Sequence, residues 1–386
     1  MSDVFDEDFL INIPNSLSTE EEINKILKFA SDKDVSDIFI RSDDHIWASI
    51  YGKKKPLTKR KLSNNEVKVI LNQIYGSHSF GYLSEGQVIN KSHDFFVNDG
   101  VDEYKRPIRK RYRFRLNATS FLSYGTLGVV LTFRSIPTTV PELEKMDVEQ
   151  AIIDCSTKTD QGLIVVCGAT GNGKSTLLAG LIGYMLRDPN GHRNIITIES
   201  PIEFVYDTID KPTSIITQCE VGQSLQSFHQ GVENALRQAP NTILVGEARD
   251  YETISSAINA SVTGHTCFST VHSNNTHETI PRMIAQYPEE LRDQAKNSLN
   301  DALKMIVVQR LIPSVDNKRV AIRSYLEFDD EVREIIANTK KELISKKIKE
   351  LTIERGQSMT KSATNHYKDG KISKEWLDRV KINYGE

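Results

Sequence analysis

The sequence has few cysteines, no long hydrophobic run and almost no excess of charge. Its four cysteines, Cys155, Cys167, Cys219 and Cys267, are far apart, so we expect neither a disulfide framework nor a zinc site. No apolar stretch approaches the length needed to cross a bilayer. The net charge of −3 argues against a protein that binds nucleic acid over its whole surface. The acidic start "MSDVFDEDFL" lacks the features of a signal peptide, and we expect a cytoplasmic protein.

The 386 residues are enough for two domains. Residues 1–137 mix helical and strand-like patterns and predict a smaller α+β domain. The segment "STEEEINKILKFASDKD" predicts a helix that opens with a capping box at Ser18. The strongly alternating "RYRFRLNATSFLSYGTLGVVLTFRSIP" turns at Gly125 and predicts a hairpin. Residues 138–150, next to prolines, predict a linker.

Residues 151–328 show a different pattern, in which short apolar strands alternate with helices. The segments "GLIVVCG", "NIITIES", "NTILVGE" and "TCFSTVHS" each predict a buried strand. This alternation predicts an α/β domain with a mostly parallel sheet. Residues 329–386 are polar and helical, with breaks at Gly356 and Gly370. The tail segment "TKKELISKKIKEL" can form a basic amphipathic helix. We expect it to pack on its own domain, with attachment to a membrane surface as the alternative.

The clearest motif is "GATGNGKST", which follows a predicted strand and opens a predicted helix. It satisfies the pattern G-x-x-x-x-G-K-[ST] of a phosphate-binding loop. Glycines let the backbone curl so that its N–H groups point inward, and the helix N-terminus adds positive potential. Lys174 is expected to reach the outer phosphates of a nucleoside triphosphate, and the Ser175 hydroxyl to bind Mg²⁺. The nucleotide is assigned to the whole loop: Gly168, Ala169, Thr170, Gly171, Asn172, Gly173, Lys174, Ser175 and Thr176.

Polar side chains follow three other predicted strands. In an open parallel sheet, ligands bind beyond the carboxyl ends of the strands, so these groups converge if the strands are neighbours. Glu247 is assigned to the metal side through a bridging water, and Glu203 to the attacking water. Glu199 is assigned to the metal shell, with its own loop as the alternative. His272 could sense the γ-phosphate, and His265 could be structural. A solvated loop position is the simpler alternative for each carboxylate.

Four boxes in this order resemble the secretion and pilus-motor ATPases, the PilT-like superfamily. They are the phosphate loop, the acidic box "TIESPIEF", the Walker B segment "ILVGEARD" and the histidine box "TGHTCFSTVH". The segment "STVHSNNTHETIPRM" most resembles the DotB/TraJ branch, the ATPases of type IVB secretion and related conjugation systems. Pilus-retraction enzymes usually read "EDPIEF" where this chain has Ser200, and their "AIRNL" segment is only loosely matched.

The resemblance implies a RecA-like P-loop NTPase domain preceded by a PAS-like N-terminal domain, in a homohexameric ring. It implies that Glu203 is the catalytic carboxylate, Glu247 the Walker B residue and His272 the histidine-box residue. The expected partners are inner-membrane secretion-complex proteins and a translocated protein or protein–DNA substrate. The resulting hypothesis is a cytoplasmic ATPase, peripheral to the inner membrane, that powers type IVB secretion. The alternatives are a pilus-retraction motor, a RecA-like nucleic-acid translocase and a nucleotide-binding scaffold without turnover.

The segment "YKRPIRKRYRFRLN" carries seven Lys or Arg residues between positions 105 and 115. Period-2 alternation predicts an apolar inner face and an outer face with Arg111, Arg113 and Arg115. A solvated strand face explains most of this charge. A nucleic-acid groove would need outward aromatic residues, so we do not expect direct nucleic-acid binding. The family resemblance favours Arg115 and Arg134 as arginines that reach phosphates of the same or a neighbouring subunit.

Overall fold

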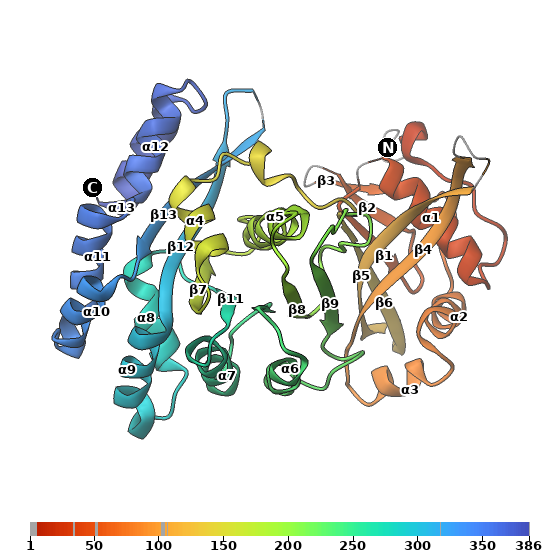
Figure 1. Cartoon of the computed structure of the whole chain (residues 1–386). Helices are drawn as coiled ribbons and strands as arrows, with labels where there is room; N and C mark the ends of the chain where they lie inside the picture. Colours follow the sequence, from red (N-terminus) through yellow and green to blue (C-terminus); the bar gives the residue numbers. More distant parts are fainter. Residues whose placement is uncertain are drawn as a thin grey trace. The chain divides into compact units, whose positions relative to one another are not determined.

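Alternating apolar and polar residues near the start of the chain form an antiparallel sheet with the order β3-β2-β1-β6-β5-β4 (Figure 1). The computed structural model describes residues 6–33, 35–50, 53–101, 105, 107–316 and 318–385. The sheet belongs to the first of two compact units, Met1–Thr138. Its strands are β1 (Asp37–Arg41), β2 (Trp47–Ile50), β3 (Lys53–Pro56), β4 (Ile89–Val101), β5 (Pro107–Ser123) and β6 (Thr126–Ile136).

Amphipathic helices cover one face of this sheet. They are η1 (Glu7–Phe9), α1 (Glu20–Asp32), α2 (Asn64–Tyr75) and α3 (Ser79–Ser84). Ile23 of α1 and Ile70 of α2 are fully buried in one core with the strands. The capping box of α1 lies one residue later than predicted. Thr19 rather than Ser18 accepts the backbone N–H of Glu22, and the Glu22 carboxylate accepts the N–H groups of both residues.

The predicted hairpin is β5–β6, and its two turn residues, Tyr124 and Gly125, both have positive φ. Such a turn matches the right-handed twist of the paired strands. The predicted outer arginine face is wrong at one position, because Arg113 is only 5% exposed. Arg113 lies on a strand paired on both sides, directly opposite Asp94 of β4 and Ile136 of β6.

The second unit, Thr139–Glu386, is built on a mostly parallel sheet with the order β13-β12-β7-β11-β10-β8-β9. Only β13 runs antiparallel within the described part of this sheet. The four apolar runs singled out in the sequence form β7, β8, β10 and β11, as predicted. The strands are β7 (Gly162–Cys167), β8 (Asn194–Glu199), β9 (Ile215–Glu220), β10 (Thr242–Val245), β11 (Thr266–Val271), β12 (Leu303–Pro313) and β13 (Arg319–Glu327).

Helices cover both faces of this sheet, because its central strands are apolar on both sides. Figure 1 shows α4 (Gln150–Lys158) and α5 (Lys174–Arg187) on one side, with η2 (Leu143–Lys145) before them. The other face carries α6 (Phe228–Ala235), η3 (Leu236–Gln238), α7 (Tyr251–Val262), α8 (Thr276–Ala285), η4 (Glu289–Leu291) and α9 (Arg292–Ala302).

The C-terminal segment is helical and packs on the second unit. It consists of α10 (Asp330–Ala337), η5 (Lys341–Leu343), α11 (Ile344–Arg355), α12 (Met359–Lys368) and α13 (Lys374–Tyr384). Ile344, Ile348 and Leu351 of α11 are buried in the same core as α7 and α8. The expectation that this tail packs on its own domain is therefore confirmed. Within the part of the chain that the structure describes, no helix is long and apolar enough to cross a membrane.

Candidate nucleotide site

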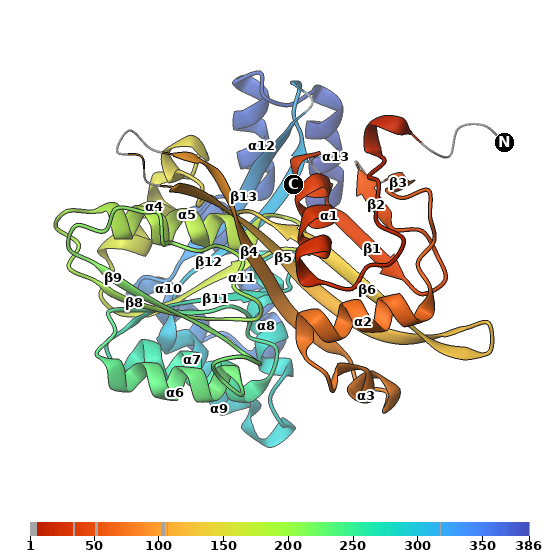
Figure 2. The same cartoon turned by 90° about the vertical axis from the view of Figure 1, so that its right-hand side faces the viewer.

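The order of the strands brings the predicted site residues to one edge of the sheet. β7, β11, β10 and β8 are consecutive, parallel neighbours. Figure 2 shows β8, β9 and β11 of this sheet above α6. The phosphate loop follows β7, His272 follows β11, Glu247 follows β10, and Glu199 ends β8. The sequence predicts each of these strand ends, and the strand order seen in the structure places them next to one another.

The loop Gly168–Thr176 has the backbone that a phosphate cradle needs. Gly168, Gly171 and Gly173 all have positive φ, at 146°, 81° and 75°. A Cβ atom on Gly168 would lie 2.5 Å from the carbonyl oxygen of Gln309, so only glycine fits there. Helix α5 starts at Lys174, directly after Gly173. The first N–H groups of α5 therefore have no intrahelical partner and can bind an anion.

Lys174 lies across this loop and is electrostatically linked to the acidic groups. Its Nζ donates hydrogen bonds to the carbonyl oxygens of Gly168 (2.9 Å) and Ala169 (3.3 Å). Burial lowers the pKa of Lys174, whereas the negative charges of Glu247 and Glu203 act in the opposite direction. The ammonium group therefore faces carboxylates from two other strand ends of the same edge.

Glu247 lies between the side chains of Arg249 and His272. Arg249 Nη2 lies 2.6 Å from one carboxylate oxygen, and His272 Nε2 lies 3.2 Å from the other. Burial by itself raises the pKa of Glu247, but the hydrogen bond from Arg249 and the charges of Arg249, His272 and Lys174 lower it below its ordinary value. Glu247 therefore carries a negative charge at neutral pH. The His272 carbonyl accepts a hydrogen bond from Arg282, which fixes the loop that carries the histidine.

Glu199 and Glu203 are four residues apart and have different surroundings. The Glu199 carboxylate accepts hydrogen bonds from the Thr197 hydroxyl (2.8 Å), the Glu203 backbone N–H (3.3 Å) and Gln218 Nε2 (3.4 Å). Burial raises its pKa to about 7. These contacts favour the alternative in which Glu199 holds its own loop over a role as a metal ligand. The loop in turn presents Glu203 beyond the end of β8.

The remaining histidine of this region is structural, as its position next to Gly264 suggests. His265 Nδ1 lies 3.0 Å from the Ala260 carbonyl oxygen and 3.4 Å from Thr263 Oγ1, both at the end of α7.

The two predicted arginines of the first unit lie side by side. Arg115 of β5 is directly opposite Arg134 of β6, and both are exposed. Asp37, the register partner of Arg134 on β1, accepts a 2.7 Å hydrogen bond from its Nε. Like charges placed directly opposite on a sheet are destabilising, and a single carboxylate compensates only one of the two. Within the described residues the charge of Arg115 is therefore not compensated, and its exposed guanidinium group is available to an anion.

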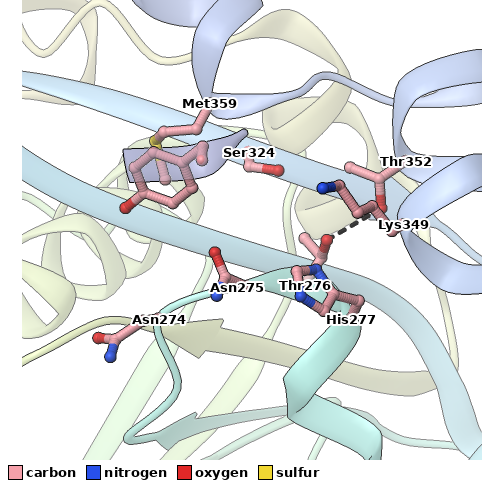
Figure 3. Close-up of a pocket in the computed structure, with 9 residues that line it drawn as sticks. Asn274, Asn275, Thr276, His277, Ser324, Lys349, Thr352 and Met359 are labelled. Carbon is pink, nitrogen blue, oxygen red and sulfur yellow. Dashed lines mark hydrogen bonds between the residues drawn. The ribbon is translucent and has the colours of Figure 1, made fainter. Parts of the chain in front are cut away.

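Two cavities of the second unit differ greatly in size. One, of about 600 Å³, is lined by residues of the phosphate loop, β12 and α13: Gly168, Ala169, Thr170, Asn172, Asn274, Asn275, Val308, Gln309, Arg310, Leu311, Asn383 and Tyr384. The other measures about 20 Å³, room for one water molecule. Figure 3 shows this smaller cavity, where Thr276 of α8 and Thr352 of α11 are joined by a 2.9 Å hydrogen bond. Only the larger cavity can hold part of a nucleotide.

The donor set at the loop suits Mg²⁺. Ser175 offers a half-buried hydroxyl in the first turn of α5, and Glu247 offers a charged carboxylate at the same edge. Among the described residues, no cluster of three or more His, Cys, Asp or Glu residues could hold a metal. Mg²⁺ is usually bound by one or two protein oxygens together with substrate phosphates and water, so this sparse set fits it.

The phosphate loop, the parallel sheet and the polar strand ends define a P-loop ATPase of RecA-like fold. The chain belongs to the Type II/IV secretion system protein family, whose sequence profile matches residues 106–377. It is therefore an ATPase of the secretion and pilus-motor family, with a smaller α+β unit before the ATPase unit. The predicted fold class and family are confirmed.

Relatives include both secretion and pilus proteins. The chain is 35% identical over 297 residues to the type IV pilus ATPase PilU of Pseudomonas aeruginosa, covering 77% of this chain and 72% of PilU. The crystal structure of the ATPase DotB of Legionella pneumophila has a TM-score of 0.86 and 35% identity, covering 97% of this chain and 99% of DotB. The pilus retraction motor PilT with bound ADP has a TM-score of 0.74 and 30% identity, covering 93% of this chain and 96% of PilT.

Sequence reasoning missed three residues that contact the site. Arg249 pairs with Glu247, and the short spacing in "GEARD" is a signal that could have revealed it. Gln309 contacts the phosphate loop from β12, and Arg323 contacts Gln309 from β13. No local pattern marks either residue, because each lies on a strand far from its partners in the sequence.

Proposed function

We propose that this chain is a homohexameric, cytoplasmic ATPase that binds peripherally at the inner membrane and powers a type IVB secretion system. The observation that carries the proposal is the meeting of Lys174, Glu247 and His272 at adjacent strand ends around a phosphate loop. The assignment to type IVB rests on the high TM-score and nearly full coverage of DotB. Residues 138–150 act as the linker between the domains 1–137 and 151–328, and 329–386 form a C-terminal helical segment.

In this mechanism the loop Gly168–Thr176 binds the phosphates of ATP, and Lys174 neutralises the outer ones. Ser175 and, through a bridging water, Glu247 would hold Mg²⁺, which would supply positive charge to the phosphate oxygens. Glu203 orients and deprotonates the attacking water, and His272 senses the γ-phosphate through its contact with Glu247. Arg115 and Arg134 approach the phosphates from the first unit of the same or a neighbouring subunit.

A pilus-retraction motor is the second candidate function, and the 35% identity with PilU supports it. In cells, a Lys174→Ala chain would separate the two functions. Loss of substrate export with normal twitching supports secretion, and the reverse supports retraction. Strong stimulation of ATP hydrolysis by DNA would instead favour a nucleic-acid translocase.

The biochemical test is phosphate release by the purified full chain, together with mass measurement with and without ATP. We expect Lys174→Ala to lower turnover by at least roughly 100-fold, because the charge on the outer phosphates is lost. We also expect a hexamer, at least with nucleotide. A chain that is monomeric under both conditions, or a Lys174→Ala protein that hydrolyses ATP normally, would contradict the proposal.

A further inference from the structure

A buried arginine behind the phosphate loop has no role in the function described so far. Arg323 of β13 is 1% exposed and is the largest fully buried side chain among the described residues. Burying a guanidinium group is costly unless all its nitrogens have partners. Nε, Nη1 and Nη2 of Arg323 all donate hydrogen bonds, and these go in two directions.

One set of hydrogen bonds holds the segment Met146–Glu149, which precedes α4. Arg323 Nη1 donates to the Asp147 carbonyl oxygen (2.8 Å) and to the Glu149 carboxylate (3.1 Å), and Nη2 donates to the Met146 carbonyl oxygen (3.2 Å). Gln357 Nε2 donates to the second Glu149 oxygen (2.7 Å). Figure 1 shows α4 beside β12, so this segment is anchored close to the strand that contacts the loop.

The other hydrogen bond reaches the phosphate loop through Gln309. Arg323 Nε donates to Gln309 Oε1 (2.7 Å), which fixes the orientation of the amide. Gln309 Nε2 then donates to the carbonyl oxygens of Asn172 (2.8 Å) and Gly173 (2.9 Å). Gln309 is only 2% exposed, so bulk water has little access to these bonds. The loop is thus joined to Met146–Glu149 through two side chains.

The hydrogen bonds from Gln309 also set the direction of N–H groups in the phosphate loop. In a planar trans peptide the N–H group points away from the C=O group. Because the Asn172 and Gly173 carbonyls point at Gln309, the N–H groups of Gly173 and Lys174 point away from it. Those are donors that a phosphate-binding loop presents to its ligand.

We propose that Gln309 is a positioning residue for the phosphate loop, and that Arg323 makes nucleotide affinity depend on how Met146–Glu149 is held. This segment begins eight residues after Thr138, where the first unit ends. A shift of the segment therefore changes the orientation of the loop carbonyls, and with it the affinity for phosphate. The inference rests on the proposed assignment of Gly168–Thr176 to the nucleotide.

The decisive variant is Gln309→Glu in the full chain. The carboxylate keeps the shape of the side chain and still accepts from Arg323, but it cannot donate to the loop carbonyls. We expect the Kd for ADP, measured by titration calorimetry, and the KM for ATP to rise roughly 10-fold, while kcat changes less, because ground and transition states lose the same phosphate contacts. A folded Gln309→Glu protein with wild-type Kd and KM would overturn the proposal.

Two matched substitutions test the link to Met146–Glu149. Arg323→Met leaves Gln309 in place but removes its connection to the segment, and we expect a weaker Kd for ADP. Arg333→Met is the control, since Arg333 is also largely buried but donates to the Leu303 carbonyl, away from the loop. It is expected to lower the melting temperature without changing Kd. A wild-type Kd in folded Arg323→Met would overturn the coupling.

The same titrations separate this inference from the proposed function. Lys174→Ala is expected to lose ADP binding. If it binds ADP like the wild type, the assignment of the loop itself is wrong. If Lys174→Ala loses binding and Gln309→Glu does not, the loop assignment stands and the role of Gln309 is wrong.

Discussion

At the residue scale, two neighbouring glutamates are expected to have separate functions. Glu199 is fully engaged by Thr197, Gln218 and the backbone of its own loop, whereas Glu203 lies close enough to Lys174 to influence its pKa. We predict that Glu203→Gln lowers kcat for ATP hydrolysis by at least roughly 100-fold, since a base near the attacking water is lost. ATP affinity should change little. Steady-state kinetics and equilibrium ATP binding measure the two effects, and unchanged kcat would remove Glu203 from the mechanism.

Glu199→Gln is the matched substitution, and we expect it to change the free energy of unfolding. Burial raises the pKa of Glu199 from 4.5 to about 7, so between these values the folded protein binds more protons than the unfolded chain. The free energy of unfolding therefore falls as the pH rises through this range, by at most about 3 kcal/mol for this group. Glu199→Gln cannot ionise and should lack this contribution. Denaturant unfolding of both proteins at pH 5 and pH 8 measures the difference, and equal pH dependence would contradict the prediction.

At the scale of elements, the C-terminal helices are predicted to stabilise the ATPase unit. Ile348 of α11 is fully buried in the same core as α7 and α8. We predict that Ile348→Ala lowers the free energy of unfolding by about 2–4 kcal/mol, because a cavity remains in a close-packed core. Lys346→Ala, on the same helix but outside this core, is the control and should have almost no effect. Denaturant unfolding measures both.

If α11 bound a membrane surface instead, the two substitutions would have the opposite effects. If α11 served as a surface anchor, Lys346→Ala would weaken binding to anionic lipid vesicles, and Ile348 would not be needed for stability. A stable Ile348→Ala protein would therefore contradict the packing seen in the structure.

An element can be predicted from the sequence when the pattern that marks it lies within a short stretch of the chain. Apolar runs and glycine spacing are local, and they predict β7, β8, β10, β11 and the loop. The strand β9 has no such marker, the apolar run "MIVV" of β12 is short, and no sequence pattern fixes the strand order. Gln309 lies 137 residues from Asn172, so its contact exists only in the folded sheet.

At the scale of the whole molecule, the paired arginines are expected to contribute to catalysis at a nucleotide site. Arg115 faces Arg134 across β5–β6, and within the described residues Asp37 is the carboxylate that pairs with Arg134. We predict that Arg115→Ala retains ATP binding and loses roughly 100-fold or more in kcat, as expected for an arginine that contacts phosphate in the transition state. Phosphate release under saturating ATP measures this loss.

Mixing two inactive variants tests whether the arginine acts between subunits. Lys174→Ala subunits retain Arg115 but lack the phosphate-binding lysine. Arg115→Ala subunits retain Lys174 but lack the arginine. If each arginine serves the neighbouring site, mixed rings should regain part of the activity. Mixtures that stay as inactive as their components would place Arg115 in its own subunit's site, or outside catalysis.

The depth of Arg323 has a consequence for how this protein responds to ionic strength. Salt screens the attraction between charges that are exposed to water, such as those of Arg115 and Arg134. At physiological ionic strength, exposed charges more than about 8 Å apart are largely screened from each other. Arg323, at 1% exposure, lies beyond the reach of dissolved ions. A rise in ionic strength would thus weaken the attraction of phosphates to Arg115 and Arg134 before it disturbed the hydrogen bonds that join Met146–Glu149 to the phosphate loop.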